Sequence, residues 1–69
     1  MSLPVDQTFT VKAFDMTWRI KATVLFGDAI LEEVAVGDGP FFPVWMLEER
    51  VSKSLTFWAN AQLLSKEAA

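Results

Sequence analysis

Hydrophobic and polar residues alternate through residues 8–26, and this period-two pattern predicts a β-hairpin with one buried face. With a two-residue turn at Asp15 and Met16, Ala13 pairs with Trp18 and Lys12 pairs with Arg19. The predicted apolar face comprises Phe9, Val11, Ala13, Trp18, Ile20 and Ala22, with Val24 and Phe26 beyond, and the polar face comprises Thr8, Thr10, Lys12, Thr17, Arg19, Lys21 and Thr23.

Residues 29–36 fit a strand better than a helix. The segment is rich in β-branched residues and lies between turns that contain Gly27 and Gly37, which is typical of a strand. A helix here would have barely two turns, too few to be stable without strong packing. Neither side of the strand is polar throughout, so we expect parts of both faces to be covered.

The period changes to 3.6 residues from Val44 onward, which predicts a long C-terminal helix with Pro43 in its first turn. Glu49 and Lys53 have the i,i+4 spacing of a supportive ion pair. The stripe expected to pack on the sheet is Val44, Leu47, Val51, Leu55, Trp58 and Ala61.

These elements predict an α+β fold, a three-stranded antiparallel meander followed by one long C-terminal helix, in the order β-β-β-α. The alternative order is β-β-α-α, with residues 28–36 as a short helix. The 69 residues allow a single domain, which we expect to span residues 1–69.

The chain carries more apolar side chains than this fold can bury. A second set lies off the sheet-facing stripe, and domains of this size usually need a disulfide, a metal or oligomerisation for stability. The chain has no cysteine, so we expect a homo-oligomer, most simply a homodimer, formed through the helix. The predicted oligomer interface comprises Trp45, Met46, Phe57, Leu63 and Leu64, of which Met46, Phe57 and Leu64 would form one stripe on a continuous helix.

The amino-acid composition excludes most kinds of catalytic site. The chain has no Cys, His or Tyr, which excludes thiol and imidazole nucleophiles and the usual zinc ligands, so we predict no catalytic residue, no cofactor and no metal. Two glutamate pairs, at 32–33 and 48–49, do not suit acid–base catalysis because adjacent side chains point apart on a strand or helix. We interpret Gly37-Asp38-Gly39 as a tight connection, since the phosphate-binding motifs are incomplete.

The basic residues of the hairpin are candidates for binding a partner. Lys12, Arg19 and Lys21 share the polar face, and Phe14 is the aromatic residue nearest to them. Directly opposite each other, Lys12 and Arg19 would repel unless an anionic group relieved them. A solvated or self-compensated face is the first interpretation, an acidic protein surface the second, and nucleic acid the least favoured because the net charge is −3.

No stretch is apolar for long enough to span a membrane, and the first residues lack the pattern of a secretory signal, so we expect a cytoplasmic protein. The sequence is therefore interpreted as a small non-enzymatic protein-interaction module that acts as a homo-oligomer, of accessory, regulatory or viral type. The alternative is a weak nucleic-acid-binding protein that uses the basic hairpin face.

Overall fold

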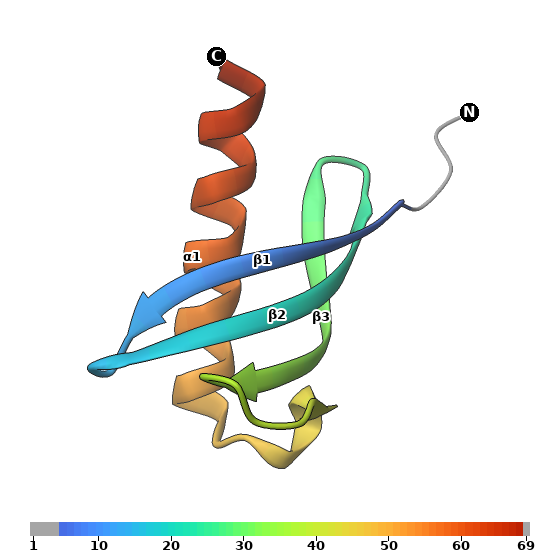
Figure 1. Ribbon diagram of the computed structural model, residues 1–69. Coiled ribbons are helices and arrows are strands. Elements are labelled where there is room, and N and C mark those ends of the chain that lie inside the picture. Colours follow the sequence, from blue (N-terminus) through green and yellow to red (C-terminus); the bar gives the residue numbers. More distant parts are fainter. Residues whose placement is uncertain (1–4, 69) are drawn as a thin grey trace.

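The computed structural model describes residues 5–68 of the chain, and the side chains of residues 6–65 (Figure 1). The three-stranded antiparallel meander with a C-terminal helix packed on it is confirmed, and a short fourth strand extends the sheet in the order β1-β2-β3-β4. Residues 29–36 lie in a strand, which excludes the alternative with a helix there. In chain order the elements are β1 (Val5–Ala13), β2 (Met16–Leu25), β3 (Asp28–Val36), β4 (Phe42–Pro43), the 3₁₀ helix η1 (Val44–Met46) and α1 (Glu49–Ala68).

The two faces of the β1–β2 hairpin are as predicted, but its register is not. The turn is Phe14-Asp15 rather than Asp15-Met16, and both turn residues have the positive φ, 55° and 59°, that a two-residue hairpin turn of type I′ requires. Lys12 therefore pairs with Thr17, and the predicted pair of Lys12 with Arg19 does not form. The register differs by two residues, which leaves the side chains of residues 8–13 and 17–24 on their predicted faces, whereas Phe14 and Phe26 lie in turns.

A β-bulge at Glu32 bends β3. Lys21 pairs with Glu33 while Ala22 pairs with Leu31, so one residue of β3 is left without a partner in β2. The extra residue changes the alternation, and buried side chains occur on β3 at Ala29 before the bulge and at Val34 after it. This explains why neither side of the predicted strand is polar throughout.

The helix begins later than predicted. Val44–Met46 form a 3₁₀ turn, and Leu47 then adopts an extended conformation with φ −83° and ψ 153°, which separates this turn from α1 at Glu49. The reason lies just before the turn, where Phe42 and Pro43 pair with β3 and tie the chain to the sheet edge. Val44 and Leu47 still pack against the core, although from the connection rather than from the helix.

The core lies between the inner face of the sheet and α1, which crosses behind β1 and β2 and runs beside β3 (Figure 1). Leu55, Ala59 and Leu63 face the sheet at a spacing of one helical turn, and each is at most 4% exposed. Trp58 is 47% exposed, so its predicted place on the sheet-facing stripe is wrong. That stripe assumed one continuous helix from Val44, which gives α1 the wrong phase. The buried core residues are Phe9, Val11, Trp18, Ile20, Ala22, Ala29, Val34, Leu55, Ala59 and Leu63.

Candidate interaction surfaces

The outer face of the sheet, opposite α1, carries the predicted basic residues, and Arg19 has a structural role there. Its Nε donates to the carbonyl of Gly37 at 2.8 Å and a terminal guanidinium nitrogen donates to that of Gly39 at 2.5 Å. The guanidinium carbon lies 4.8 Å from the centroid of the Phe41 ring, within the range of a cation–π contact. Arg19 thus holds the connection between β3 and β4 against the sheet, and Ala35, its partner on β3, is fully buried.

Lys21 shares the same aromatic ring, whereas Lys12 does not. The Lys21 ammonium lies 4.3 Å from the Phe41 centroid, and the residue pairs with Glu33 across the strands. Lys12 is exposed opposite Thr17, and it belongs to no salt bridge among the described residues. The three predicted basic residues are therefore brought to one face, and two of them, Arg19 and Lys21, contact Phe41 of the same chain.

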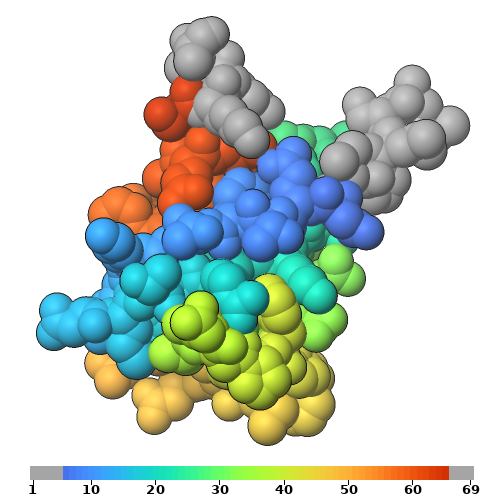
Figure 2. All heavy atoms as spheres, in the orientation of Figure 1, coloured from blue at the N-terminus to red at the C-terminus, as the bar shows by residue number. Residues whose placement is uncertain are grey.

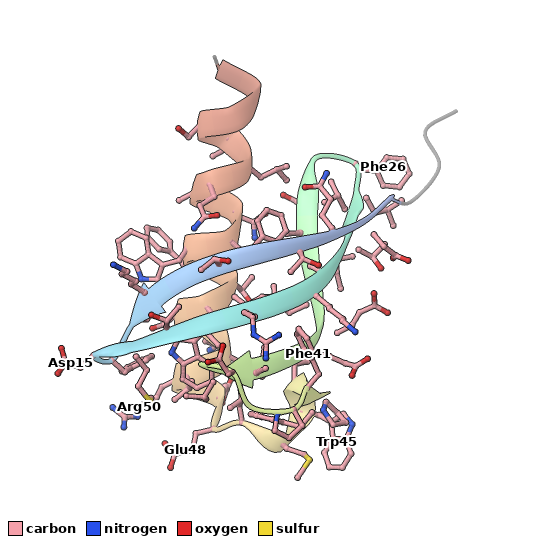
Figure 3. The ribbon with its side chains drawn as sticks, in the orientation of Figure 1. Asp15, Phe26, Phe41, Trp45, Glu48 and Arg50 are labelled. Carbon is pink, nitrogen blue, oxygen red and sulfur yellow. The ribbon has the colours of Figure 1, made fainter. Side chains whose placement is uncertain are left out.

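Phe14 does not lie on the basic face. It occupies the hairpin turn and is 44% exposed, and its ring lies 6.0 Å from the guanidinium of Arg50 at the start of α1. Figure 3 shows Asp15 and Arg50 at this same end of the molecule. The register shift explains the difference, since the pattern placed Phe14 within the first strand opposite Thr17.

The bulge at Glu32 creates a shallow acidic hollow on the outer face, about 410 Å³ in volume. Glu32 and Glu33 both line it, together with Asp6 and Lys21, so the expectation that these adjacent glutamates point apart is wrong. Thr23 Oγ1 lies 2.6 Å from Glu32 Oε1 and 3.2 Å from Asp6 Oδ1, and its hydroxyl donates its hydrogen to either carboxylate. No group of three or more acidic, His or Cys side chains in the described part of the chain is arranged to hold a metal ion.

The second predicted pair of glutamates forms surface ion pairs. Glu49 Oε1 lies 3.0 Å from the Lys53 ammonium, which is the predicted i,i+4 pair, and Glu48 lies 3.3 Å from Arg50. All four side chains are largely exposed, so these pairs contribute little to stability.

The predicted oligomer interface is divided between two places and loses one member. Leu63 is in the core, 4% exposed, because the later start of α1 turns it toward the sheet. Met46 lies in η1 and not on α1, so it cannot form one helical stripe with Phe57 and Leu64. Phe57 and Leu64 are both 64% exposed and lie seven residues apart, two turns along one face of α1. Trp45 and Met46, 79% and 62% exposed, lie in η1, which precedes α1 in the chain.

Two further large apolar residues, Phe26 and Trp58, are exposed although the sequence pattern predicted that both would be buried. Phe26, assigned to the apolar face of the hairpin, is in the β2–β3 turn with φ 53° and is 81% exposed. Figure 3 shows it at the opposite end of the sheet from Asp15. Trp58 lies beside Phe57, with the two rings edge to face at a centroid distance of 5.2 Å. These two aromatic residues and Leu64 make up the apolar surface of α1, which we call the outer helix surface.

No family model, no curated protein and no solved structure matches this chain. No helix in the described part of the chain is long and apolar enough to cross a membrane.

Proposed function

We propose that the protein is a small non-enzymatic interaction module of the cytoplasm that works by self-association, and that the outer helix surface is its contact. The observation that carries the proposal is the exposure of Phe57 and Leu64, two turns apart on one face of α1, with Trp58 beside them. Large apolar side chains grouped on one exposed face are typical of protein contacts, and identical copies most often pair such faces about a two-fold axis.

An antiparallel pair of α1 helices would bury Phe57 and Leu64 of both copies in one contact. With the two-fold axis between Phe57 and Leu64, each Phe57 would lie opposite the Leu64 of the other copy, and the small Ala61 between them would allow the helices to approach closely. Trp45 and Met46 lie in η1, outside this helix pair, and are available to a different protein partner.

The composition of the chain and the outer face of the sheet support a binding role over a catalytic one. The chain has no His or Cys, and the acidic hollow combines carboxylates with the ammonium of Lys21 on an open surface. General acid–base catalysis requires groups held in place against a substrate, whereas Asp6, Lys21 and Glu32 are exposed.

Nucleic-acid binding is the less supported alternative. Arg19 is committed to two backbone carbonyls and Phe41, and Lys21 lies against the same ring. Lys12 is then the one basic side chain of the predicted cluster that is free of such contacts among the described residues. An acidic hollow lies on the same face, and like charges would repel a phosphate backbone.

Sedimentation velocity over a wide range of concentration tests the proposal. Phe57→Glu introduces a charge into the outer helix surface and should give a lighter species than the parent at the same concentration. Phe26→Glu is the matched control, because it makes the same change at an exposed phenylalanine in the β2–β3 turn and should sediment like the parent. A parent protein that sediments as Phe57→Glu does, over the whole range, would contradict the proposal.

A further inference from the structure

The first strand forms an open edge of the sheet. In the strand order β1-β2-β3-β4, β1 has a neighbour on one side only, and its nine residues contain no proline. An edge of this length presents a row of backbone N–H and C=O groups that another strand can pair with. Figure 2 shows β1, in blue, along the front of the molecule.

The hairpin geometry determines which backbone groups face outward. Ala13 and Met16 flank the two-residue turn and form its closing hydrogen-bonded pair, and hydrogen-bonded and non-hydrogen-bonded pairs alternate from there. Thr8, Thr10 and Lys12 therefore direct their N–H and C=O groups to the open edge. One contact supports this directly, because the side-chain amide of Gln62 on α1 donates to the carbonyl of Thr10 at 2.6 Å. Among the described residues, no other side-chain hydrogen bond reaches these edge groups.

The charges along this edge are complementary to themselves. Asp6, Thr8, Thr10 and Lys12 have exposed side chains on the outer face, with the acidic residue at one end and the basic residue at the other. If a second copy lies antiparallel with Phe9 opposite Phe9, Thr8 lies opposite Thr10 and Asp6 opposite Lys12, twice by symmetry. A shift of two residues in either direction loses both of these charge pairs, so the charges select one register.

We propose that the β1 edge pairs in this register with the β1 edge of a second copy, joining two sheets about a two-fold axis at Phe9. In this register the backbone hydrogen bonds can form, because the facing residues Thr8 and Thr10 both direct their N–H and C=O groups to the open edge. Neither Asp6 nor Lys12 has an ion-pair partner among the described residues, so both charges are available to the second copy.

The helix adds an apolar contact on the same side. Gln62 reaches the β1 edge, and Trp58 lies one turn earlier on the same side of α1, where it is 47% exposed. A two-fold axis perpendicular to the sheet leaves both helices on one face of the joined sheet, with these sides turned toward each other. The Thr10 carbonyl has two lone pairs, so it accepts from the partner strand beside or in place of Gln62.

The edge contact shares only Trp58 with the outer helix surface of the proposed function. It does not use Phe57 or Leu64, so one substitution in each contact distinguishes the two. Sedimentation velocity should show that Phe57→Glu still dimerises through β1, that Asp6→Lys still dimerises through α1, and that the double variant is monomeric. If Phe57→Glu is already monomeric while the parent associates and Asp6→Lys matches the parent, the edge proposal is overturned and the proposed function stands. If only Asp6→Lys lowers the mass, the edge proposal stands and the helix contact fails.

A charge exchange in the Phe57→Glu variant then tests the register. Asp6→Lys alone and Lys12→Asp alone should each weaken the dimer by about tenfold or more, since two cross-strand pairs change from attraction to repulsion at once. Mixing these two variants should restore the dimer, because the lysine introduced at position 6 of one copy then faces the aspartate introduced at position 12 of the other, and the unchanged Asp6 faces the unchanged Lys12 across the axis. Lys53→Asp reverses an exposed charge on α1 and should have no effect on the edge dimer. A mixture as weak as its two components would overturn the register.

Discussion

The side chain of Asn60 on α1 is hydrogen-bonded to the backbone of Ala29 on β3. Its Oδ1 accepts from the Ala29 N–H at 2.8 Å, and its Nδ2 donates to the Thr56 carbonyl at 2.9 Å and lies 3.5 Å from the carbonyl of Ala29. Because Ala29 is buried, its N–H has no easy access to water, and one amide side chain both satisfies it and fixes the position of the helix along the strand.

Replacement of this amide should therefore weaken the fold. Asn60→Ala leaves the Ala29 N–H without its partner, and we expect the free energy of unfolding to fall by about 1–3 kcal/mol. Gln62→Ala is the control, since it removes an exposed helix amide bonded to a strand carbonyl that water can reach, and it should cost well under half as much. Urea denaturation, followed by tryptophan fluorescence at one fixed protein concentration, measures both changes. Equal losses for the two variants would contradict the role assigned to Asn60.

Arg19 should behave as a structural residue. Arg19→Gln removes two hydrogen bonds to the β3–β4 connection and a cation–π contact, and we expect a loss of about 1–3 kcal/mol in the free energy of unfolding. Lys21→Gln loses only its exposed contact with Phe41 and should cost about 0.5–1 kcal/mol at most. Hydrogen exchange should also quicken at Gly39 in Arg19→Gln and stay unchanged in Lys21→Gln. Equal and small effects of both variants would mean that Arg19 is merely solvated.

The faces of the first two strands could be predicted from the sequence, but the turn between them could not. The period-two pattern fixes which side of Val11 or Ile20 meets the core, and it is insensitive to a shift of two residues. Neither Phe14-Asp15 nor Asp15-Met16 contains the glycine that marks most two-residue turns, so composition did not distinguish them.

The bulge and the start of the helix depend on contacts distant in sequence. The residues around Glu32 do not indicate a bulge. The one feature of the sequence that relates to the bulge is the mixed polarity of both sides of the strand. Periodicity also continues from Val44 into α1, because Val44 and Leu47 do pack on the core. The periodicity does not reveal that Phe42 pairs with Val34 and that α1 begins only at Glu49. The later start places Leu63 in the core and Trp58 at the edge of the core.

The candidate surfaces were predicted in part for the same reasons. Phe57 and Leu64 are exposed, as was predicted for apolar residues that lie off the sheet-facing stripe. Their position on the side of α1 opposite Leu55 depends only on the helical period. Gln62 and Asn60 were missed, since polar residues on a helix give no sign in the sequence of which strand their side chains reach.

The strain in the hairpin turn leads to the last prediction. Phe14 and Asp15 both have left-handed backbone conformations, which cost a residue with a side chain about 1–2 kcal/mol and cost glycine almost nothing. Asp15→Gly should therefore raise the free energy of unfolding, by about 0.5–1 kcal/mol once the greater freedom of glycine in the unfolded chain is subtracted. Gly37→Ala is the reciprocal test, because Gly37 has φ +57° and an added Cβ would meet no atom within 4 Å, so its cost comes from the backbone alone. Thermal and urea denaturation should show opposite signs for the two variants and similar magnitudes. A loss of stability in Asp15→Gly would mean that the Asp15 side chain contributes more to the turn than its backbone strain removes.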